Sequence, residues 1–228
     1  MKSSSPRPEA IEADYRRRYD AVLTRLAANL NAHLVECTKG EARIDRIGAR
    51  AKDIDRFVKK AMTEKDGRPK YDDPLNQIQD QIGARIIVFY HSDVERIDQL
   101  VKKYFRAIEY KAVVPDSESE FGYFGQHLIL VMPTDVIEED MEKALIPEFF
   151  ELQIKTLFQH AWSEADHDLG YKPGETPLTS EQKRLIAFTS AQAWGADHMF
   201  DRLFRERTQR PCMNSLTDGV TRQWGGLS

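Results

Sequence analysis

The sequence predicts an α/β (α+β) fold in which a mixed β-sheet is flanked by helices. Apolar or alternating runs of strand length occur at 82–90, 126–132 and 149–156, and stretches with helical spacing of apolar residues precede, separate and follow them. The chain has 228 residues, of which 41% are hydrophobic and 31% are charged. These values are typical of one large globular domain. The expected order of elements is ααβαβββαα, without an internal repeat.

Two helices are expected before the first strand. Residues 1–8 are rich in Ser and Pro and are expected to be disordered, whereas apolar residues at helical spacing predict a helix over Pro8–Val35. A second helix is predicted over about 46–62 by the i, i+3, i+4, i+7 pattern of Ile54, Phe57, Val58 and Ala61. Both helices are amphipathic and are expected to pack on the sheet.

The strands that follow alternate with further helices. A buried strand at 82–90 precedes a helix at 94–104, and the remaining elements are strands at 110–114, 126–132 and 149–156 and helices at 158–169 and 180–207. The expected organisation is therefore a disordered N-terminus (1–8), an N-terminal helix (9–40), a central domain (41–175), a C-terminal helix (176–210) and a tail (211–228).

Charge is distributed unevenly along the chain. The net charge of −4 argues against a broadly basic nucleic-acid binder. Residues 43–70, however, hold ten Lys or Arg against five acids, whereas residues 135–151 hold seven acids against one Lys. A cationic segment combined with isolated carboxylates could bind a polyanion together with a divalent metal, although solvated helix faces give similar counts.

Membrane, secreted and zinc-binding classes are not indicated. Apolar stretches such as Leu128–Met132 are far shorter than the roughly 20 residues that cross a bilayer, and the N-terminus lacks the apolar core of a signal peptide. Cys37 and Cys212 lie far apart, without zinc-ligand spacing. We therefore expect a soluble, cytoplasmic protein with reduced thiols.

Three cations repeat at helical spacing on the predicted second helix. Lys52, Arg56 and Lys60 lie at i, i+4 and i+8, which places them on one face over about 12 Å and suits a triphosphate. Arg50, on another side, could stack on a base or bind a further phosphate. The alternative interpretation is a solvated amphipathic face.

Two strands carry isolated charged residues. Asp80 directly precedes the strand at 82–90, where a carboxylate can ligate Mg²⁺ or serve only as a turn residue. Arg85 lies inside that otherwise apolar strand, which indicates either a binding role or a salt bridge at an edge. Glu151, Gln153 and Lys155 share one strand face and could bind metal and phosphates, or could simply face solvent.

Two further groups could carry chemistry. The segment GYFGQH at 122–127 offers Tyr123 for stacking on a base and His127 for donation to phosphate, although a β-turn with a core tyrosine would also explain it. His160, Glu164 and His167 share a helix face. Since the HExxH order is missing, hydrogen-bonded histidines explain this second group better than a metal site.

In order and spacing, four motifs together resemble the synthetase domain of the RelA/SpoT alarmone synthetases over about 46–172. The family's R-x-K-x-x-x-S-x-x-x-K, D-x-x-G-x-R, G-Y-x-S-x-H and E-x-Q-x-R-T correspond here to RAKDIDRFVKK (50–60), DQIGAR (80–85), GYFGQH (122–127) and ELQIKT (151–156). A similar Trp162, Glu164, His167 and Tyr171-Lys172 follow. The length resembles the small single-domain members.

This resemblance implies a nucleotidyltransferase-like synthetase domain with extra terminal helices. It also implies Mg²⁺-dependent transfer of the pyrophosphoryl group of ATP to the ribose 3′-hydroxyl of GDP or GTP, giving (p)ppGpp. The implied ligands of Mg²⁺, which are also the implied catalytic residues, are Asp80 and Glu151. The implied ATP-binding residues are Arg50, Lys52, Arg56, Lys60 and Arg85. The expected acceptor-binding residues are Tyr123, His127, Gln153 and Lys155.

Three departures from the family pattern concern the substrates. Arg56 and Gly125 stand where the family has serine, and the loop at 115–121 is acidic where relatives that use guanine nucleotides carry lysines. The acceptor therefore stays open. A toxin-type synthetase acting on the tRNA 3′ end or on adenine nucleotides, with a possible antitoxin, is one alternative, and an inactive nucleotide-binding regulator is another. A homo-oligomer formed through the terminal helices is also expected.

Overall fold

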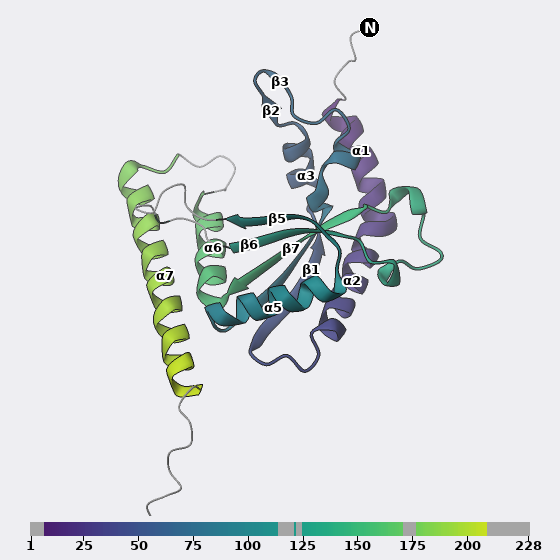
Figure 1. The fold of residues 1–228 in the computed structure, drawn as a ribbon. Coiled ribbons are helices and arrows are strands. Elements are labelled where there is room, and N and C mark those ends of the chain that lie inside the picture. The colour runs from purple at the N-terminus through teal and green to yellow at the C-terminus, as the bar shows by residue number, and fades with distance from the viewer. Residues whose placement is uncertain (1–6, 114–120, 122–124, 171–176, 209–228) are drawn as a thin grey trace, which may run out of the picture.

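The centre of the fold is a five-stranded sheet with the order β1-β4-β7-β6-β5 (Figure 1). The computed structural model describes residues 7–113, 121, 125–170 and 177–208. β4 and β7 pair in parallel and the other neighbours are antiparallel, so the predicted mixed sheet is confirmed. Its strands are β1 (Ile44–Ala51), β4 (Ile82–Val88), β5 (Ala107–Val113), β6 (Gly125–Val131) and β7 (Phe149–Thr156).

The main helices flank this sheet. α1 and α2 form one continuous rod through a π-helical turn at Tyr19–Leu23, and α7 packs against α6 beyond one end of the strands (Figure 1). The main helices are α1 (Pro8–Arg18), α2 (Thr24–Cys37), α3 (Ile54–Ala61), α5 (His91–Tyr104), α6 (Leu157–Gly170) and α7 (Ser180–Thr208). Short pieces are β2 (Glu64–Lys65), β3 (Arg68–Pro69), α4 (Pro74–Gln77) and 3₁₀ turns at Gln79–Gln81, Thr134–Val136 and Lys143–Leu145.

The two faces of the sheet differ in character. One face carries the core, which packs against α1, α2 and α5 and includes the buried side chains of Ala84, Ile86, Leu128, Leu130, Phe150, Leu152 and Ile154. Side chains alternate between faces along a strand, so the neighbouring residues Arg85, His127, Glu151, Gln153 and Lys155 lie on the opposite face. This opposite face holds the candidate site.

The predicted helix over 46–62 is wrong in its first half. Residues Ile44–Ala51 form β1, which pairs with β4 along its whole length, and the helix α3 begins only at Ile54. The apolar residues at helical spacing all lie within α3, Ile54–Ala61, which has eight residues. Asp53 caps α3 because its side chain accepts a hydrogen bond from the Arg56 backbone N–H at 3.2 Å. The sheet therefore has one strand more than the sequence indicated.

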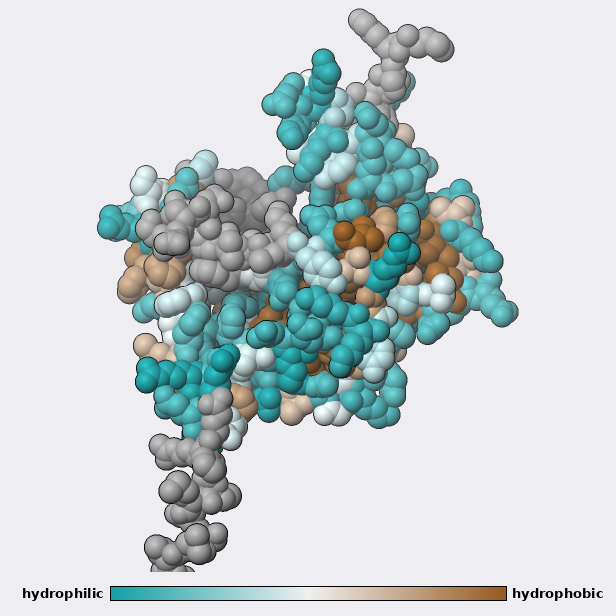
Figure 2. Space-filling model, in the orientation of Figure 1, coloured by the Kyte–Doolittle hydropathy of each residue, from teal (hydrophilic) through white to brown (hydrophobic). Residues whose placement is uncertain are grey.

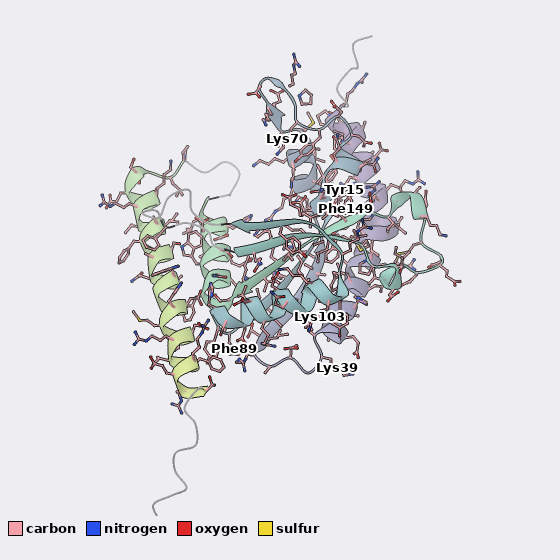
Figure 3. The ribbon with its side chains drawn as sticks, in the orientation of Figure 1. Tyr15, Lys39, Lys70, Phe89, Lys103 and Phe149 are labelled. Carbon is pink, nitrogen blue, oxygen red and sulfur yellow. The ribbon has the colours of Figure 1, made fainter. Side chains whose placement is uncertain are left out.

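The N-terminal rod holds α3 in place. Tyr15, labelled in Figure 3, stacks on Phe57 with ring centroids 3.7 Å apart, and its hydroxyl donates to the Lys52 carbonyl at 2.8 Å. Lys52 also extends the β1–β4 ladder, because its N–H donates to the Gln81 carbonyl at 2.8 Å. Lys52 is therefore fixed at the junction between β1 and α3.

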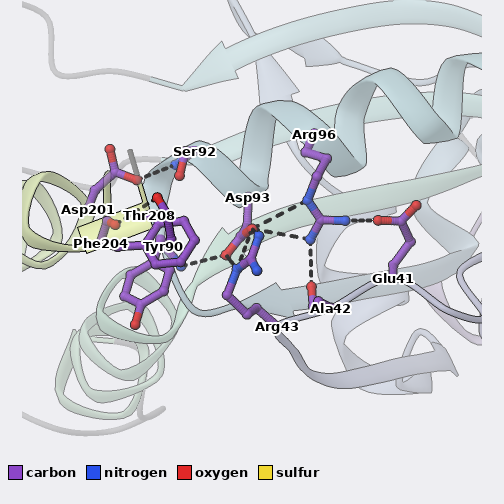
Figure 4. A network of polar contacts seen from close by, with 10 residues as sticks. All are labelled: Glu41, Ala42, Arg43, Tyr90, Ser92, Asp93, Arg96, Asp201, Phe204 and Thr208. Atoms are coloured by element: carbon purple, nitrogen blue, oxygen red, sulfur yellow. Dashed lines mark hydrogen bonds and ion pairs between the residues drawn. The ribbon is translucent and has the colours of Figure 1, made fainter. Parts of the chain in front are cut away.

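The C-terminal half of α7 is fastened to the start of α5 (Figure 4). Asp201 accepts a hydrogen bond from the Ser92 N–H at 2.8 Å. Phe204 stacks on Tyr90 at 4.5 Å and lies under the Arg43 guanidinium, also at 4.5 Å. Figure 2, in the orientation of Figure 1, shows a largely hydrophilic face of the molecule, with a hydrophobic area on the side where α1 and the β6–β7 connection lie.

Candidate active site

A polar cleft of about 640 Å³ lies on the second face of the sheet. Residues of β1, β4, β7, α3 and α6 line it, together with the turn before β4. Its charged and amide side chains belong to Arg50, Lys52, Asp53, Arg56, Asp80, Arg85, Glu151, Gln153 and Glu164. Most residues expected from the sequence to bind ATP or metal are therefore brought together in one cleft.

The register of the strands sets the floor of this cleft. Arg50 pairs with Gly83, and Gly83 pairs with Glu151, so these three residues form one row across β1, β4 and β7. Nothing lies within 4 Å of the position that a Cβ at Gly83 would occupy. The absent side chain therefore leaves open space between Arg50 and Glu151.

Asp80 is held by two lysines. Its Oδ2 accepts from the Nζ of Lys52 and of Lys60, each at 2.8 Å, while its Oδ1 is buried with no hydrogen-bond partner among the described residues. Burial alone would raise the pKa of Asp80, but the charges and hydrogen bonds of Lys52 and Lys60 outweigh it and hold the pKa below its ordinary value. Asp80 is therefore an ionised carboxylate with one free oxygen.

Glu151 is oriented by neighbours on the same face. Its Oε1 lies 2.7 Å from Nδ1 of His127, and its Oε2 accepts from Nε2 of Gln153 at 3.3 Å. Burial raises the pKa of Glu151 and the charge of Asp80 acts in the same direction. The hydrogen bond and charge of His127, together with the hydrogen bond from Gln153, outweigh both, and the pKa lies below its ordinary value. The charge of Asp80 acts on Glu151, so the two carboxylates interact electrostatically across the cleft.

The cationic residues surround these acids from several elements. Arg50 lies on β1, Lys52 lies in the junction that follows, and only Arg56 and Lys60 lie on α3. The prediction that Lys52, Arg56 and Lys60 share one helix is therefore wrong for Lys52, because β1 occupies the region where the first turns of that helix were expected. The cations reach the cleft from a strand, a junction and a helix.

Arg85 forms a salt bridge, which was one of the two interpretations of its place in an apolar strand, but β4 lies inside the sheet and not at the expected edge. Its Nη1 donates to Oε1 of Glu164 on α6 at 2.8 Å, and both residues line the cleft. His160 Nδ1 lies 3.8 Å from the same Glu164 oxygen. Glu164 is therefore a charged residue of this cleft. The sequence patterns placed it only on a helix face with His160 and His167.

Lys155 lies at the far end of the same strand face and is 6% exposed. Its Nζ donates to Oγ of Ser163 on α6 at 3.3 Å. Burial lowers the pKa of Lys155 to about 8, and the charge of Glu164 only partly opposes this effect. The lysine thus titrates close to the physiological range.

The donor set suits a hard divalent cation. Mg²⁺ is commonly held by one or two carboxylates together with substrate phosphates, and Asp80 offers a buried oxygen that has no partner among the described residues. No group of three or more His, Cys, Asp or Glu among the described residues could hold a metal by protein ligands alone. A metal at this site would take its remaining ligands from water or from the phosphates of a substrate.

Two residues complete the comparison of site and sequence. Tyr123, expected to stack on the acceptor base, lies outside the described residues. Tyr19, at the start of the π-helical turn, lines the cleft. In the sequence it looked like one more member of an apolar helix stripe, so nothing there could separate it from the core.

A cleft lined by cations and carboxylates on a mixed α/β sheet is typical of proteins that bind nucleotides together with a divalent metal. A family model described as a region found in RelA / SpoT proteins matches residues 49–176, more than half of the chain. The chain belongs to this RelA/SpoT family. Among the described residues, no helix is both long and apolar enough to cross a membrane.

Three relatives illustrate the likeness. The chain is 28% identical over 104 residues to GTP pyrophosphokinase YjbM of Bacillus subtilis (strain 168), an alignment covering 43% of this chain and about half (46%) of the relative. A GTP pyrophosphokinase family protein from Streptococcus pneumoniae is 22% identical with a TM-score of 0.67, covering 86% of this chain and 95% of that one. Small alarmone synthetase 1 from Bacillus subtilis, bound to its product pppGpp, is 21% identical with a TM-score of 0.63, covering 86% and 98%. These two structures share the fold of this protein.

Proposed function

We propose that this protein transfers the β,γ-pyrophosphoryl group of ATP to the ribose 3′-hydroxyl of GDP or GTP, giving (p)ppGpp. The observation that carries the proposal is the meeting of Asp80 and Glu151 in one cleft with the cations of β1, α3 and β4. Membership of the RelA/SpoT family supports the same reaction. A relative of the same fold binds the product pppGpp.

The cations of the cleft are assigned to the donor nucleotide. Lys52, Arg56 and Lys60 neutralise the triphosphate, and Arg50 and Arg85 offer guanidinium planes to the adenine base. Lys52 and Lys60 both donate to Oδ2 of Asp80, so they would hold the triphosphate next to the carboxylate that is proposed to bind the metal ion.

Asp80 and Glu151 would hold Mg²⁺, which supplies neutralisation of the charge that develops on the phosphoryl oxygens. His127 and Gln153 hold the carboxylate of Glu151 in position, and Lys155 lies further along the same face for the phosphates of the acceptor. Pyrophosphoryl transfer requires mainly positioning and charge stabilisation. The side chains of this face are arranged for both.

The charge of the loop at 115–121 supports a second candidate for the acceptor. The loop at 115–121 holds three acids and no Lys or Arg, which disfavours the 5′-phosphates of a guanine nucleotide. An adenine nucleotide would meet the same repulsion, whereas a tRNA 3′ end presents its terminal ribose with fewer phosphates close by. This observation favours a toxin-type reaction on the tRNA 3′ end, with an antitoxin, as the alternative. A toxin-type reaction on an adenine nucleotide is a further alternative that the acidic loop does not favour.

Incubation with ATP labelled in the γ-phosphate tests the function and the acceptor together. The protein receives GDP, GTP, AMP, ATP alone or deacylated tRNA, and the products are separated. Label in GDP or GTP supports the proposal, whereas label in tRNA or an adenine nucleotide supports the alternative. Label in no acceptor, with ATP binding retained, would leave an inactive nucleotide-binding regulator.

The proposed assembly is a cytoplasmic homo-oligomer that uses the terminal helices. Large apolar side chains are at least half exposed on α7, namely Leu185, Phe188, Met199, Phe200 and Leu203. Exposed apolar areas of this kind favour association. Light scattering after size-exclusion chromatography measures the oligomer, and substitution of Phe188 and Met199 by Glu is expected to give monomers.

A further inference from the structure

A second cavity lies between α5, α6, α7 and the start of β6. Its volume is about 560 Å³, and it shares none of its described lining residues with the nucleotide cleft. The faces of three helices form its walls, and the ends of α7 are fastened on both sides. Trp162 Nε1 donates to the Ile186 carbonyl at 3.3 Å near one end, and Phe204 stacks on Tyr90 near the other. The cavity is therefore part of the folded domain.

Two of the residues that line this cavity have buried carboxylates with an unused acceptor oxygen. Asp98 and Asp197 are 4% and 2% exposed, and one carboxylate oxygen of each has no hydrogen-bond partner among the described residues. Their other oxygens accept from Lys102 Nζ at 2.5 Å and from Thr156 Oγ1 at 2.6 Å. A buried polar atom without a partner costs free energy. A ligand that donates hydrogen bonds would remove this cost.

The charge around the cavity is negative. Its described acids are Glu95, Asp98 and Asp197, against Lys102. Burial lowers the pKa of His91, so the His91 ring does not balance the acids at neutral pH. Burial raises the pKa of Asp197 only to about 6, which leaves it ionised at pH 7. A polyphosphate would be repelled here, whereas a cation would be attracted.

Aromatic rings complete the walls. Trp162 and Trp194 both line the cavity, and the rings of Trp194 and His198 lie 4.0 Å apart. The face of a tryptophan attracts organic cations through its quadrupole. Metal binding is not favoured, because the described residues offer no group of three His, Cys, Asp or Glu for a metal ion.

We propose that this cavity binds a small organic cation that carries several N–H donors, of the diamine or guanidinium class. The amine or guanidinium nitrogens donate to the free oxygens of Asp98 and Asp197, and the alkyl part lies against Trp194. Such a ligand satisfies the unused acceptors and offsets the negative charge together. Its site is separate from the reaction, and the inference stands whether or not the proposed function holds.

Calorimetry on the full-length protein tests this site with agmatine, putrescine and spermidine as probes. We expect saturable binding of at least one of them with one site per chain, and a rise in thermal unfolding temperature at saturation because the ligand binds the folded state. Inorganic phosphate serves as the anionic comparison probe. Binding of none of the three amines, or displacement of a bound amine by inorganic phosphate, would overturn the proposal.

Variants assign the binding to the cavity. Asp197→Asn is expected to weaken amine binding at least tenfold, whereas Glu181→Gln removes the same charge from an exposed position of α7 outside the described lining and is expected to leave it unchanged. Trp194→Ala tests the aromatic wall. Because Trp194 is 42% exposed, this variant is expected to fold, and it keeps the test usable if Asp197→Asn does not fold. Equal binding by the wild type and Trp194→Ala, or an equal loss in Glu181→Gln, would contradict the site.

Discussion

Nδ1 of His127 lies 2.7 Å from Oε1 of Glu151, although the two residues come from different strands. The antiparallel register places Gln153 directly opposite His127, so the contact with Glu151 runs diagonally across one face of the sheet. Gln153 reaches the other oxygen of the same carboxylate at 3.3 Å. Two neighbours thus orient the acid to which we assign metal binding.

His127→Ala is expected to lower turnover about tenfold or more, since a carboxylate that loses its orienting partner binds metal less well. His127→Gln, which can still donate to Glu151, should recover part of the loss. Steady-state rates at saturating ATP measure the effect. Unchanged rates in the alanine variant would show that His127 does not position Glu151.

Gly83→Val is expected to block nucleotide binding without loss of stability. A side chain at this position meets no atom within 4 Å, so the fold tolerates it, but it fills the open space between Arg50 and Glu151. Thermal unfolding and ATP titration report the two effects separately. Normal ATP affinity in a folded Gly83→Val protein would place the nucleotide elsewhere.

Lys155→Met is expected to stabilise the protein at pH 7 while it lowers activity. Burial lowers the pKa of Lys155 to about 8, so the native state carries the cost of a buried charge below pH 8. Between pH 8 and the ordinary lysine pKa the unfolded chain still binds this proton and the native state does not, and wild-type stability therefore rises with pH relative to the variant.

Denaturant unfolding of both proteins at pH 7 and pH 10 tests this sign. The advantage of Lys155→Met should be on the order of 3 kcal/mol at pH 7, as an upper estimate, and should shrink at pH 10. An advantage that grows with pH would contradict the lowered pKa.

Asp93→Ala is expected to destabilise the protein by about 3–5 kcal/mol, the usual cost of removing one partner from a buried ion pair. Asp93 is 1% exposed and accepts from Arg43 at 2.8 Å and from Arg96 at 3.2 Å, next to the contacts that fasten α7 (Figure 4). Asp45→Ala removes the exposed pair with Arg46 and serves as the matched control, with an expected cost below about 1 kcal/mol. Equal costs in urea unfolding would contradict the structural role of Asp93.

Much of the fold was predictable because periodicity shows most clearly in elements with one buried face. The strict alternation at 149–156 corresponds to β7, Phe149–Thr156, and the apolar runs at 82–90 and 126–132 contain most of β4 and β6. β1 was missed because it is an edge strand with few buried side chains and a glycine within it. Its sequence therefore lacks the strand signature that burial imposes.

The sequence predicted which residues form the site better than it predicted how their side chains contact one another. Sequence spacing identified Asp80, Glu151 and the cations as candidates, but it could not show that Lys52 and Lys60 share one oxygen of Asp80. It also could not pair Arg85 with Glu164, because these residues lie 79 positions apart and meet only through packing of α6 on the sheet. Contacts of this kind depend on tertiary structure, and local patterns do not encode them.

Pyrophosphoryl transfer by Asp80→Asn and Glu151→Gln, measured in single-turnover experiments with labelled ATP and the preferred acceptor, tests the shared role of the two acids most directly. Asp45→Asn and Glu142→Gln are exposed controls with the same chemical change. We expect both cleft variants to lose at least a hundredfold in rate while ATP affinity without metal stays within a few-fold, and both controls to keep full activity. Full activity in either cleft variant would contradict the assignment of these acids to the reaction.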